Sequence, residues 1–194
     1  MRFEKMAIPE VVLLTPKMWE DERGYFREVF RQNLFEDVVG AFAFVQDNEA
    51  CSVSEGTIRG LHFQVEPKAQ GKLVSCLSGA ILDVAVDLRS GSPSYGRHVS
   101  AKLTADNGCR LWVPPGFAHG YCTLEPATKV GYSVTEYYDA HHDRGLAFDD
   151  PALGIAWPVS RKTAVLSPKD VRQPGFAELG SVFTYRPAAA PVAL

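Results

Sequence analysis

The sequence is divided into short apolar segments that end in Gly, Pro, Asn or Ser, and helical periodicity is almost absent. Runs of this kind are typical of strands joined by tight turns. One short helix is expected over Arg31 to Val38. The clearest strand runs are KLVSCL (72–77), AILDVAVDL (80–88), GRHVSAKLT (96–104), RLWV (110–113) and TKVGYSVTEYY (128–138). Many short strands at such intervals predict an antiparallel sandwich or barrel.

The alternation of side chains along a strand predicts which residues share a face. In the run 80–88, one face is wholly apolar and the other carries Asp83 and Asp87. That second face is therefore expected to meet solvent or a polar barrel lumen. In the run 128–138, Tyr132 and Tyr138 fall on the same face and are expected to look into the same space.

Composition and charge narrow the class of protein. The formal net charge is −3 and the sequence pI is near 6.0, so nucleic acid and anionic membranes are not expected as partners. The N-terminal MRFEKMAIPE lacks an apolar signal run, and no segment approaches the length of a membrane span. Four scattered cysteines without a CxxC pair predict reduced thiols and a cytoplasmic location.

The length of 194 residues and the 46% hydrophobic content suit one sizeable core. We therefore expect a single domain over residues 1–185. The remaining segment, 186–194, is rich in Pro and Ala and is expected to form a flexible tail.

Two segments resemble the paired motifs of the cupin barrel. One runs from Gly56 to Gly79 and contains His62, and the other runs from Gly108 to Gly120 and contains His119. Metal-binding cupins place two His and a Glu in the first motif and a third His in the second. Here the second His position is Gln64, and no Glu stands at the ligand spacing downstream. Two imidazoles are too few for a secure zinc or iron site, so we expect no metal.

A set of longer motifs follows in order from about Ile8 to Pro174. It comprises DERGYFREVF, FVQDN, RGLHFQ, AQGKLV, SGAILDVAVDLRSGSPSYG, LWVPPGFAHGY, TEYY, ALGIAWP and LSPKD. In order and spacing these motifs resemble the dTDP-4-dehydrorhamnose 3,5-epimerases, a family of cupin barrels. The resemblance implies an all-β, mainly antiparallel jelly-roll barrel with short peripheral helices. It also implies an enzyme that inverts carbons 3 and 5 of a dTDP-4-keto-6-deoxyhexose without a cofactor.

Such an inversion needs a base, a group that stabilises the enolate, and an acid on the opposite face of the sugar. His62 suits the base because an unperturbed imidazole has a pKa of ~6.5, although a lone His is more often a core residue. The resemblance favours catalysis and assigns Asp170 as the carboxylate that orients His62. It also implies that Lys72 stabilises the enolate, the role that a metal ion would otherwise have. Without the resemblance, Lys72 would be interpreted as a solvated lysine.

Tyr132 is the candidate acid, since a phenol with a pKa of ~10 is protonated at neutral pH. Without the resemblance it would be one core aromatic among seven tyrosines. The resemblance makes His119 a second histidine of the site, and Asp83 is a candidate partner for it.

The resemblance also assigns substrate contacts. Arg59 and Arg23 match contacts to the diphosphate, and Tyr138 matches the residue that stacks on thymine. Asp143 stands where the family commonly has Glu and is one methylene shorter. The further matching positions, which would otherwise be read as solvated polar side chains, are Glu28, Gln46, Asp47, Asn48 and Lys169.

In the family, an N-terminal arm, here about residues 1–30, crosses to the partner subunit. Arg23, Phe26 and Glu28 would then complete the neighbouring site, in a homodimer with two-fold geometry. Three other functions stay open from the sequence. They are inversion of a single carbon, binding of a sugar nucleotide without catalysis, and metal-dependent oxygenase or isomerase chemistry.

Overall fold

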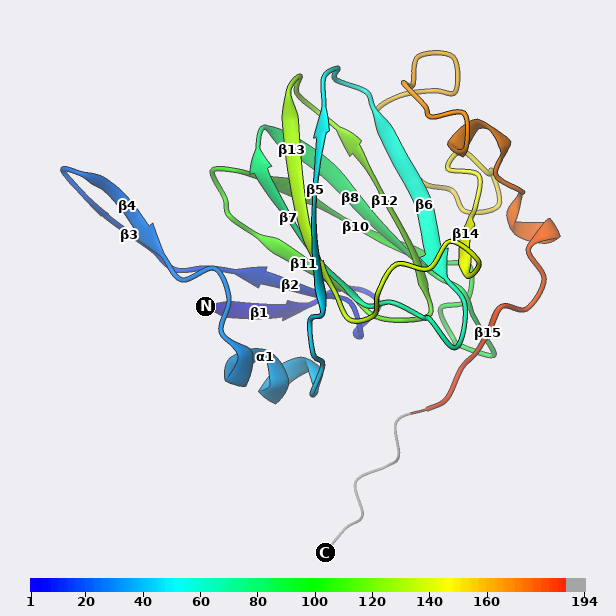
Figure 1. Cartoon of the computed structure of the whole chain (residues 1–194), viewed down its shortest axis with the longest axis horizontal. Coiled ribbons are helices and arrows are strands. Elements are labelled where there is room, and N and C mark those ends of the chain that lie inside the picture. Colours follow the sequence, from blue (N-terminus) through cyan, green and yellow to red (C-terminus); the bar gives the residue numbers. More distant parts are fainter. Residues whose placement is uncertain (188–194) are drawn as a thin grey trace, which may run out of the picture.

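The protein, described here by a computed structural model over residues 1–187, is built around two antiparallel β-sheets that face each other (Figure 1). One sheet has six strands in the order β1-β2-β11-β7-β13-β5, and the other has five in the order β10-β8-β12-β6-β14. A hairpin of β3 with β4 and a parallel pair of β9 with β15 lie outside them. The expected all-β, mainly antiparallel fold with short peripheral helices is confirmed.

The elements are short, and all five strand runs named above contain a strand. The bounds are β1 Arg2–Lys5, β2 Val12–Thr15, β3 Met18–Asp21, β4 Gly24–Arg27, α1 Gln32–Val39, β5 Gln46–Ser52, β6 Ile58–Gln64, β7 Lys72–Ser78, β8 Ala80–Asp87, β9 Arg89–Ser90, β10 His98–Thr104, β11 Arg110–Val113, β12 Phe117–Thr123, β13 Thr128–Val134, β14 Asp143–Gly145 and β15 Phe183–Thr184. Two 3-10 turns, η1 Asp170–Arg172 and η2 Phe176–Glu178, follow in the C-terminal segment.

Strand β8 shows how the alternation of side chains positions the interior. Val84 and Val86 pack with Leu153 and Phe183, which belong to the C-terminal part of the chain that covers the outer face of the five-stranded sheet. Ile81 and other side chains of the opposite face pack between the two sheets. Asp83, on that inner face, is completely buried. Of the two environments expected for Asp83, the structure shows the polar lumen.

Helix α1 covers part of the outer face of the six-stranded sheet. It begins one residue after the predicted start and ends at Val39, before Gly40, whose φ of 109° is costly for residues with a Cβ. Phe35 is fully buried, and its ring packs edge-on against Trp112 with 5.2 Å between ring centroids. A short amphipathic helix is stabilised mainly by such packing.

The hairpin formed by β3 and β4 projects away from both sheets (Figure 1). Its aromatic side chains are largely solvent-exposed, with Trp19 at 47%, Tyr25 at 60% and Phe26 at 70%. Strands β1 and β2, in contrast, are paired within the six-stranded sheet. The segment expected as an arm over residues 1–30 therefore combines a sheet-forming part with a projecting hairpin.

Tyr132 and Tyr138 line one cavity, as predicted, but they do not share a strand face. Strand β13 ends at Val134, so Tyr138 does not follow the alternation that contains Tyr132. The chain leaves the sheet because the main chain after Val134 is held by other groups. Thr135 N–H donates to the Gly71 carbonyl, and the Gln70 side chain donates to the Glu136 carbonyl at 2.6 Å.

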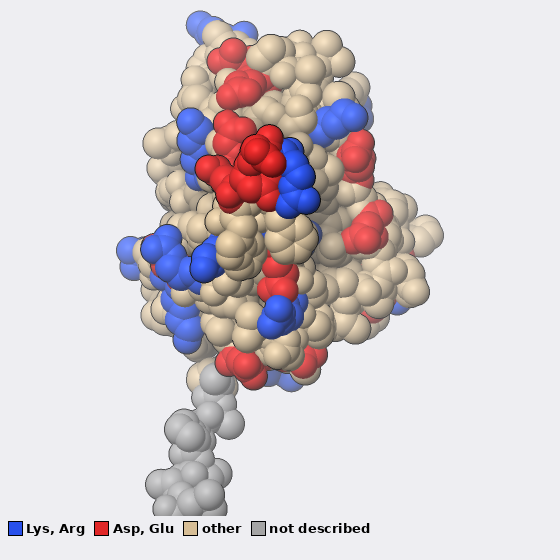
Figure 2. Space-filling view, turned by 90° about the vertical axis from the view of Figure 1, so that its left-hand side faces the viewer, with Lys and Arg blue, Asp and Glu red and all other residues tan. Residues whose placement is uncertain are grey.

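The surface mixes charges of both signs. On the face that lies to the left in Figure 1, acidic and basic side chains stand next to one another (Figure 2). Within residues 1–187, no helix has the length and apolar character needed to cross a membrane. The cysteines, all in this part of the chain, are free thiols, and three of them are buried. A flexible tail is expected over residues 186–194, and residues 188–194 of it lie outside the described residues.

Candidate active site

His62 and Asp170 form a hydrogen-bonded pair at the edge of a cavity between the sheets. His62 lies on β6 and Asp170 begins η1, and His62 Nε2 lies 2.5 Å from Asp170 Oδ1. Ser167 Oγ donates to the other carboxylate oxygen at 2.8 Å. Burial alone would raise the pKa of Asp170, but the hydrogen bonds from His62 and Ser167 outweigh it and lower that pKa. Asp170 is therefore ionised at neutral pH, and the His62 proton is placed on Nε2.

A second histidine–carboxylate pair lies beside the first. His119 Nε2 is 2.7 Å from Asp83 Oδ1, and both side chains are buried. His119 on β12 is directly opposite His62 in the register of β12 with β6. The predicted pairing of His119 with Asp83 is thus present in the geometry.

A local irregularity brings Arg59 and His62 to the same cavity. Arg59 pairs with Tyr121 and His62 with His119, so three residues on β6 span the distance of two on β12. Such a bulge turns a side chain that strict alternation would send to the other face. Gly60 lies within the bulge, where a Cβ would come to 2.7 Å from the His119 carbonyl oxygen, so no larger residue fits.

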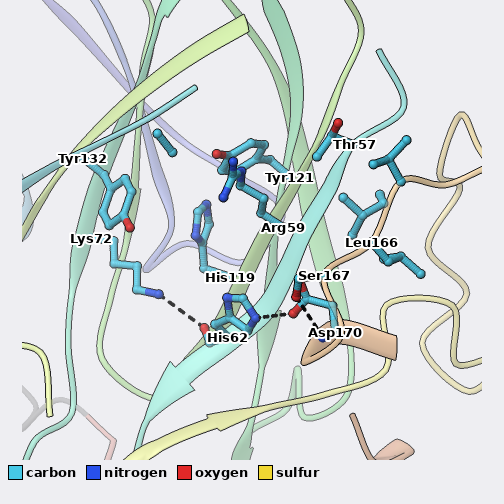
Figure 3. Close-up of a pocket in the computed structure, with 13 residues that line it drawn as sticks. Thr57, Arg59, His62, Lys72, His119, Tyr121, Tyr132, Leu166, Ser167 and Asp170 are labelled. Atoms are coloured by element: carbon cyan, nitrogen blue, oxygen red, sulfur yellow. Dashed lines mark hydrogen bonds and ion pairs between the residues drawn. The ribbon is translucent and has the colours of Figure 1, made fainter. Parts of the chain in front are cut away.

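Lys72 and Tyr132 reach the cavity from the facing sheet (Figure 3). Lys72 begins β7, and its Nζ donates to the His62 carbonyl oxygen at 3.3 Å. Burial lowers the pKa of Lys72 to about 8, although the carboxylates of Asp143 and Asp83 partly oppose this. Burial also raises the pKa of Tyr132, on β13, above that of a free phenol. Lys72 is mostly charged and Tyr132 is protonated at pH 7.

These side chains line a cavity of about 390 Å³, a volume within the usual range of small-molecule sites. A second cavity of about 350 Å³ shares His62, Lys72 and Tyr132 with the first. Its other polar side chains include the predicted substrate contacts Gln46, Asn48, Tyr138, Asp143 and Lys169. The two cavities therefore form one continuous site around the three shared residues.

Asp143 organises the rim of the second cavity. The Tyr138 hydroxyl donates to Asp143 Oδ2 at 3.1 Å, and the Lys169 ammonium forms an ion pair with the same oxygen. Despite being one methylene shorter than Glu, Asp143 thus contacts two of the predicted substrate residues.

Gln64 occupies the position of a metal-binding histidine in other cupins, and here its amide is used inside the protein. Its Nε2 donates to the carbonyls of Lys68 and Tyr137, and its Oε1 accepts from Asp139 N–H. In the part of the chain that the structure describes, no group of three or more His, Cys, Asp or Glu side chains is placed to hold a metal ion. The residues present do not fit the metal site of metal-binding cupins.

Four predicted substrate residues lie elsewhere. Arg23 forms an ion pair with Asp21 at the tip of the projecting hairpin, and Glu28 forms one with Arg31. Phe26 is exposed on β4. Asp47 accepts a hydrogen bond from Ser133 and lines a different hollow on the outer face of the six-stranded sheet.

Sequence reasoning missed some residues of the first cavity. Tyr121, Ser167 and Thr57 line it, and none of them was singled out. Tyr121 had a usable signal, because it lies two residues after His119 in one strand and so shares its face. Ser167 and Thr57 had none, since each reaches the cavity from an irregular segment.

Comparison with known proteins agrees with this geometry. The family profile described as dTDP-4-dehydrorhamnose 3,5-epimerase matches residues 5–178. The chain belongs to this family. The dTDP-4-dehydrorhamnose 3,5-epimerase from Sinorhizobium fredii is 55% identical over 185 residues, which cover 95% of this chain and 94% of the relative.

Solved structures of epimerases share the fold. The dTDP-6-deoxy-D-glucose-3,5-epimerase from Legionella pneumophila, in complex with dTDP-4-keto-L-rhamnose, has a TM-score of 0.90 at 37% identity and covers 96% of this chain and 99% of that chain. A 3′-monoepimerase from Streptomyces bikiniensis, in complex with dTDP-quinovose, has a TM-score of 0.85 at 32% identity, covering 93% of this chain and 92% of that chain. The family resemblance found in the sequence is confirmed.

Proposed function

We propose that this protein inverts carbons 3 and 5 of a dTDP-4-keto-6-deoxyhexose and so converts dTDP-4-dehydro-6-deoxy-D-glucose to dTDP-4-dehydro-L-rhamnose. Both carbons flank the ketone, so loss of either C–H proton gives an enolate. Inversion then requires a proton to return on the opposite face of the ring. The observation that carries the proposal is that His62 and Tyr132 lie on the two facing sheets and line one cavity.

His62 is the base in this proposal. Its Nε2–H donates to the ionised Asp170, which leaves Nδ1 free to accept the proton from carbon. The carboxylate then stabilises the imidazolium that forms, as in other histidine–carboxylate pairs. The hydrogen bond from Ser167 holds the carboxylate in place.

Lys72 stabilises the enolate. Its ammonium is buried against the His62 main chain, in the cavity that the His62 ring also lines. A cation in a water-poor site stabilises a developing oxyanion far more than one in water does. His119, hydrogen-bonded to Asp83, is a second group of the same cavity that is suited to contact the keto oxygen.

Tyr132 is the acid that returns the proton. Its raised pKa keeps the phenol protonated, and its strand lies in the sheet opposite β6. A proton taken by His62 on one side of the ring is therefore replaced from the other side. This arrangement supports inversion rather than exchange with retention.

The nucleotide part is proposed to contact the residues that surround the second cavity and the outer part of the first. Among residues 1–187, Arg59 donates only to neutral oxygens, Ser52 Oγ and the Cys51 carbonyl, so its charge is available to a phosphate. Tyr138 is 58% exposed at the rim and offers a ring face to thymine. Relatives with bound dTDP sugars support this assignment.

The protein is proposed to act as a homodimer in which the β3–β4 hairpin reaches the neighbouring site. The support is physical, because exposed aromatic side chains of a projecting hairpin are typical of surfaces that a partner covers. Arg23, Phe26 and Glu28 would then join a site that they do not reach within their own chain.

The test is incubation with the 4-keto-6-deoxyglucose nucleotide in heavy water, followed by NMR of the sugar ring. Deuterium at both C3 and C5, with the rhamno product, is expected. Deuterium at one carbon would support the second candidate, single epimerisation, which the likeness to a 3′-monoepimerase keeps relevant. Absence of deuterium at both carbons would overturn catalysis and favour a binding protein. Chelator in a parallel sample is expected to change nothing.

A further inference from the structure

Tyr121 carries a buried hydroxyl that the proposed mechanism does not use. Only 3% of the residue is exposed, and its hydroxyl finds no hydrogen-bond partner within residues 1–187. Burial raises the pKa of this phenol well above its ordinary value, so the hydroxyl stays protonated. A buried hydroxyl without a partner is unfavourable, and an unsatisfied group of this kind calls for an explanation such as a bound molecule or a role in catalysis.

The sheet register gives Tyr121 a defined place relative to the reacting groups. Tyr121 on β12 pairs with Asp83 on β8 and with Arg59 on β6. The next inward-facing position on the same strand is His119, opposite His62. The cavity wall thus has one row that contains Arg59 and Tyr121 and a neighbouring row that contains both histidines. Figure 3 shows the Tyr121 ring beside Arg59.

The order of these rows matches the order of groups along the substrate. The diphosphate is attached to C1, and Arg59 is its proposed contact. Proton transfer at C3 and C5 is assigned to the row that contains His62. C2 lies between C1 and C3, and its hydroxyl is the only ring hydroxyl on a carbon that does not react.

We infer that the Tyr121 hydroxyl hydrogen-bonds the C2 hydroxyl of the bound sugar and makes Tyr121 a substrate-binding residue specific for the hexose. The inference rests on the proposed function, because it takes its substrate from there. A contact at C2 holds the ring by a carbon whose configuration is constant while C3 and C5 change. A phenol both donates to and accepts from a hydroxyl, which suits this group better than a purely accepting phosphate oxygen.

The test combines Tyr121→Phe with a substrate that lacks the C2 hydroxyl. The wild type and the variant are each assayed with the 4-keto-6-deoxyglucose nucleotide and with its 2-deoxy analogue. We expect kcat/KM to fall about ten-fold for either change alone, a typical effect of one lost hydrogen bond, with no further fall when the two are combined. The affinity for dTDP, measured by calorimetry, is expected to be the same in both proteins.

Thermal unfolding is the control for structural damage. Because the hydroxyl has no partner within the described part of the chain, Tyr121→Phe is expected to leave Tm unchanged or to raise it. A lower Tm with equal losses on both sugars would mean a structural role and would overturn the inference. Unchanged kcat/KM, or weaker dTDP binding, would overturn it too. If the wild type epimerises neither sugar, both the proposed function and the inference about Tyr121 are overturned. If the wild type is active but insensitive to the C2 hydroxyl, only the inference about Tyr121 is overturned.

Discussion

His62 Nε2 and Asp170 Oδ1 lie 2.5 Å apart, although 108 residues separate them in the chain. The carboxylate is almost completely buried, and a second hydrogen bond from Ser167 fixes its orientation. The imidazole is therefore held with Nε2 in this hydrogen bond, and Nδ1 has no hydrogen-bond partner within residues 1–187. A base prepared in this way needs no rearrangement before it takes a proton.

The first prediction concerns this base. His62→Asn is expected to lower exchange of the C3 and C5 protons by about 100- to 10,000-fold, the range that general base catalysis typically contributes. NMR in heavy water measures the exchange, and calorimetry with dTDP is the binding control. Asp170→Asn is the matched variant and is expected to lose less, since the imidazole itself is retained. Full exchange in His62→Asn would refute the role of His62.

Tyr132→Phe separates the two proton transfers. The variant is expected to lose product formation by about 100-fold while deuterium wash-in changes less, because an enolate that forms without the acid is reprotonated on its original face by His62, whose proton has exchanged with solvent. The ratio of wash-in to product, followed by NMR, is the decisive quantity. An equal fall of both would show that the phenol does not deliver the proton. Tyr137→Phe, in the exposed loop after β13, serves as a matched control with wild-type values expected.

Lys72 connects activity with stability. Its pKa is about 8 in the folded protein and 10.5 in an unfolded chain, so between these pH values the unfolded state binds more protons and stability rises with pH. Below pH 8 the full cost of burying the charge is present. Lys72→Met is therefore expected to raise the free energy of unfolding at pH 7 by roughly 3 kcal/mol. Urea unfolding at pH 7 and pH 10 measures this, with the gain smaller at pH 10.

The same substitution is expected to lower kcat about 100- to 1000-fold, as loss of one oxyanion-stabilising group typically does. In the wild type, kcat/KM should fall as the pH rises through about 8, where Lys72 loses its proton. A variant that is more stable and still fully active would contradict the enolate role.

Subunit mixing tests the projecting hairpin. If Phe26 completes the neighbouring site, Phe26→Ala and His62→Asn dimers are each impaired, but a mixed dimer contains one intact site. Mixing equal amounts of the two variants under conditions of subunit exchange is expected to restore activity toward about a quarter of the wild-type value, because about half of the dimers are mixed and each of these has one intact site of two. Recovery should be absent if Phe26 serves its own chain or no chain. Val53→Ala, at a side chain that is 81% exposed, is the control and should behave as the wild type.

Gln64 is expected to position the loop that carries Tyr138. Gln64→Leu removes three part-buried hydrogen bonds between the buried Gln64 amide and the main chain of residues 68, 137 and 139. We expect a loss of about 3 kcal/mol in the free energy of unfolding and weaker dTDP binding. Gln70→Leu, which removes a single hydrogen bond to the same loop, should show a smaller change in both. Unaltered dTDP affinity in Gln64→Leu would rule out the positioning role.

Local chemistry determined much of this protein directly from the sequence. Strands β7, β8, β10, β11 and β13 follow the apolar runs, because side-chain alternation and turn residues are properties of neighbours in the chain. The same alternation placed Asp83 on the face opposite the apolar valines, and the motifs around His62, Lys72 and His119 indicated the family. All three side chains line the cavity.

Only the tertiary structure decided how the remaining groups meet. The bulge in β6 that turns Arg59 and His62 to one cavity depends on the pairing with β12. The end of β13 at Val134 depends on a hydrogen bond from the Gln70 side chain and on one to the Gly71 carbonyl. The polar lumen around Asp83 and the buried Tyr121 hydroxyl likewise follow from packing two sheets together. Contacts between residues far apart in the chain leave no periodic signal, because their geometry is set by which strands pair and in which register.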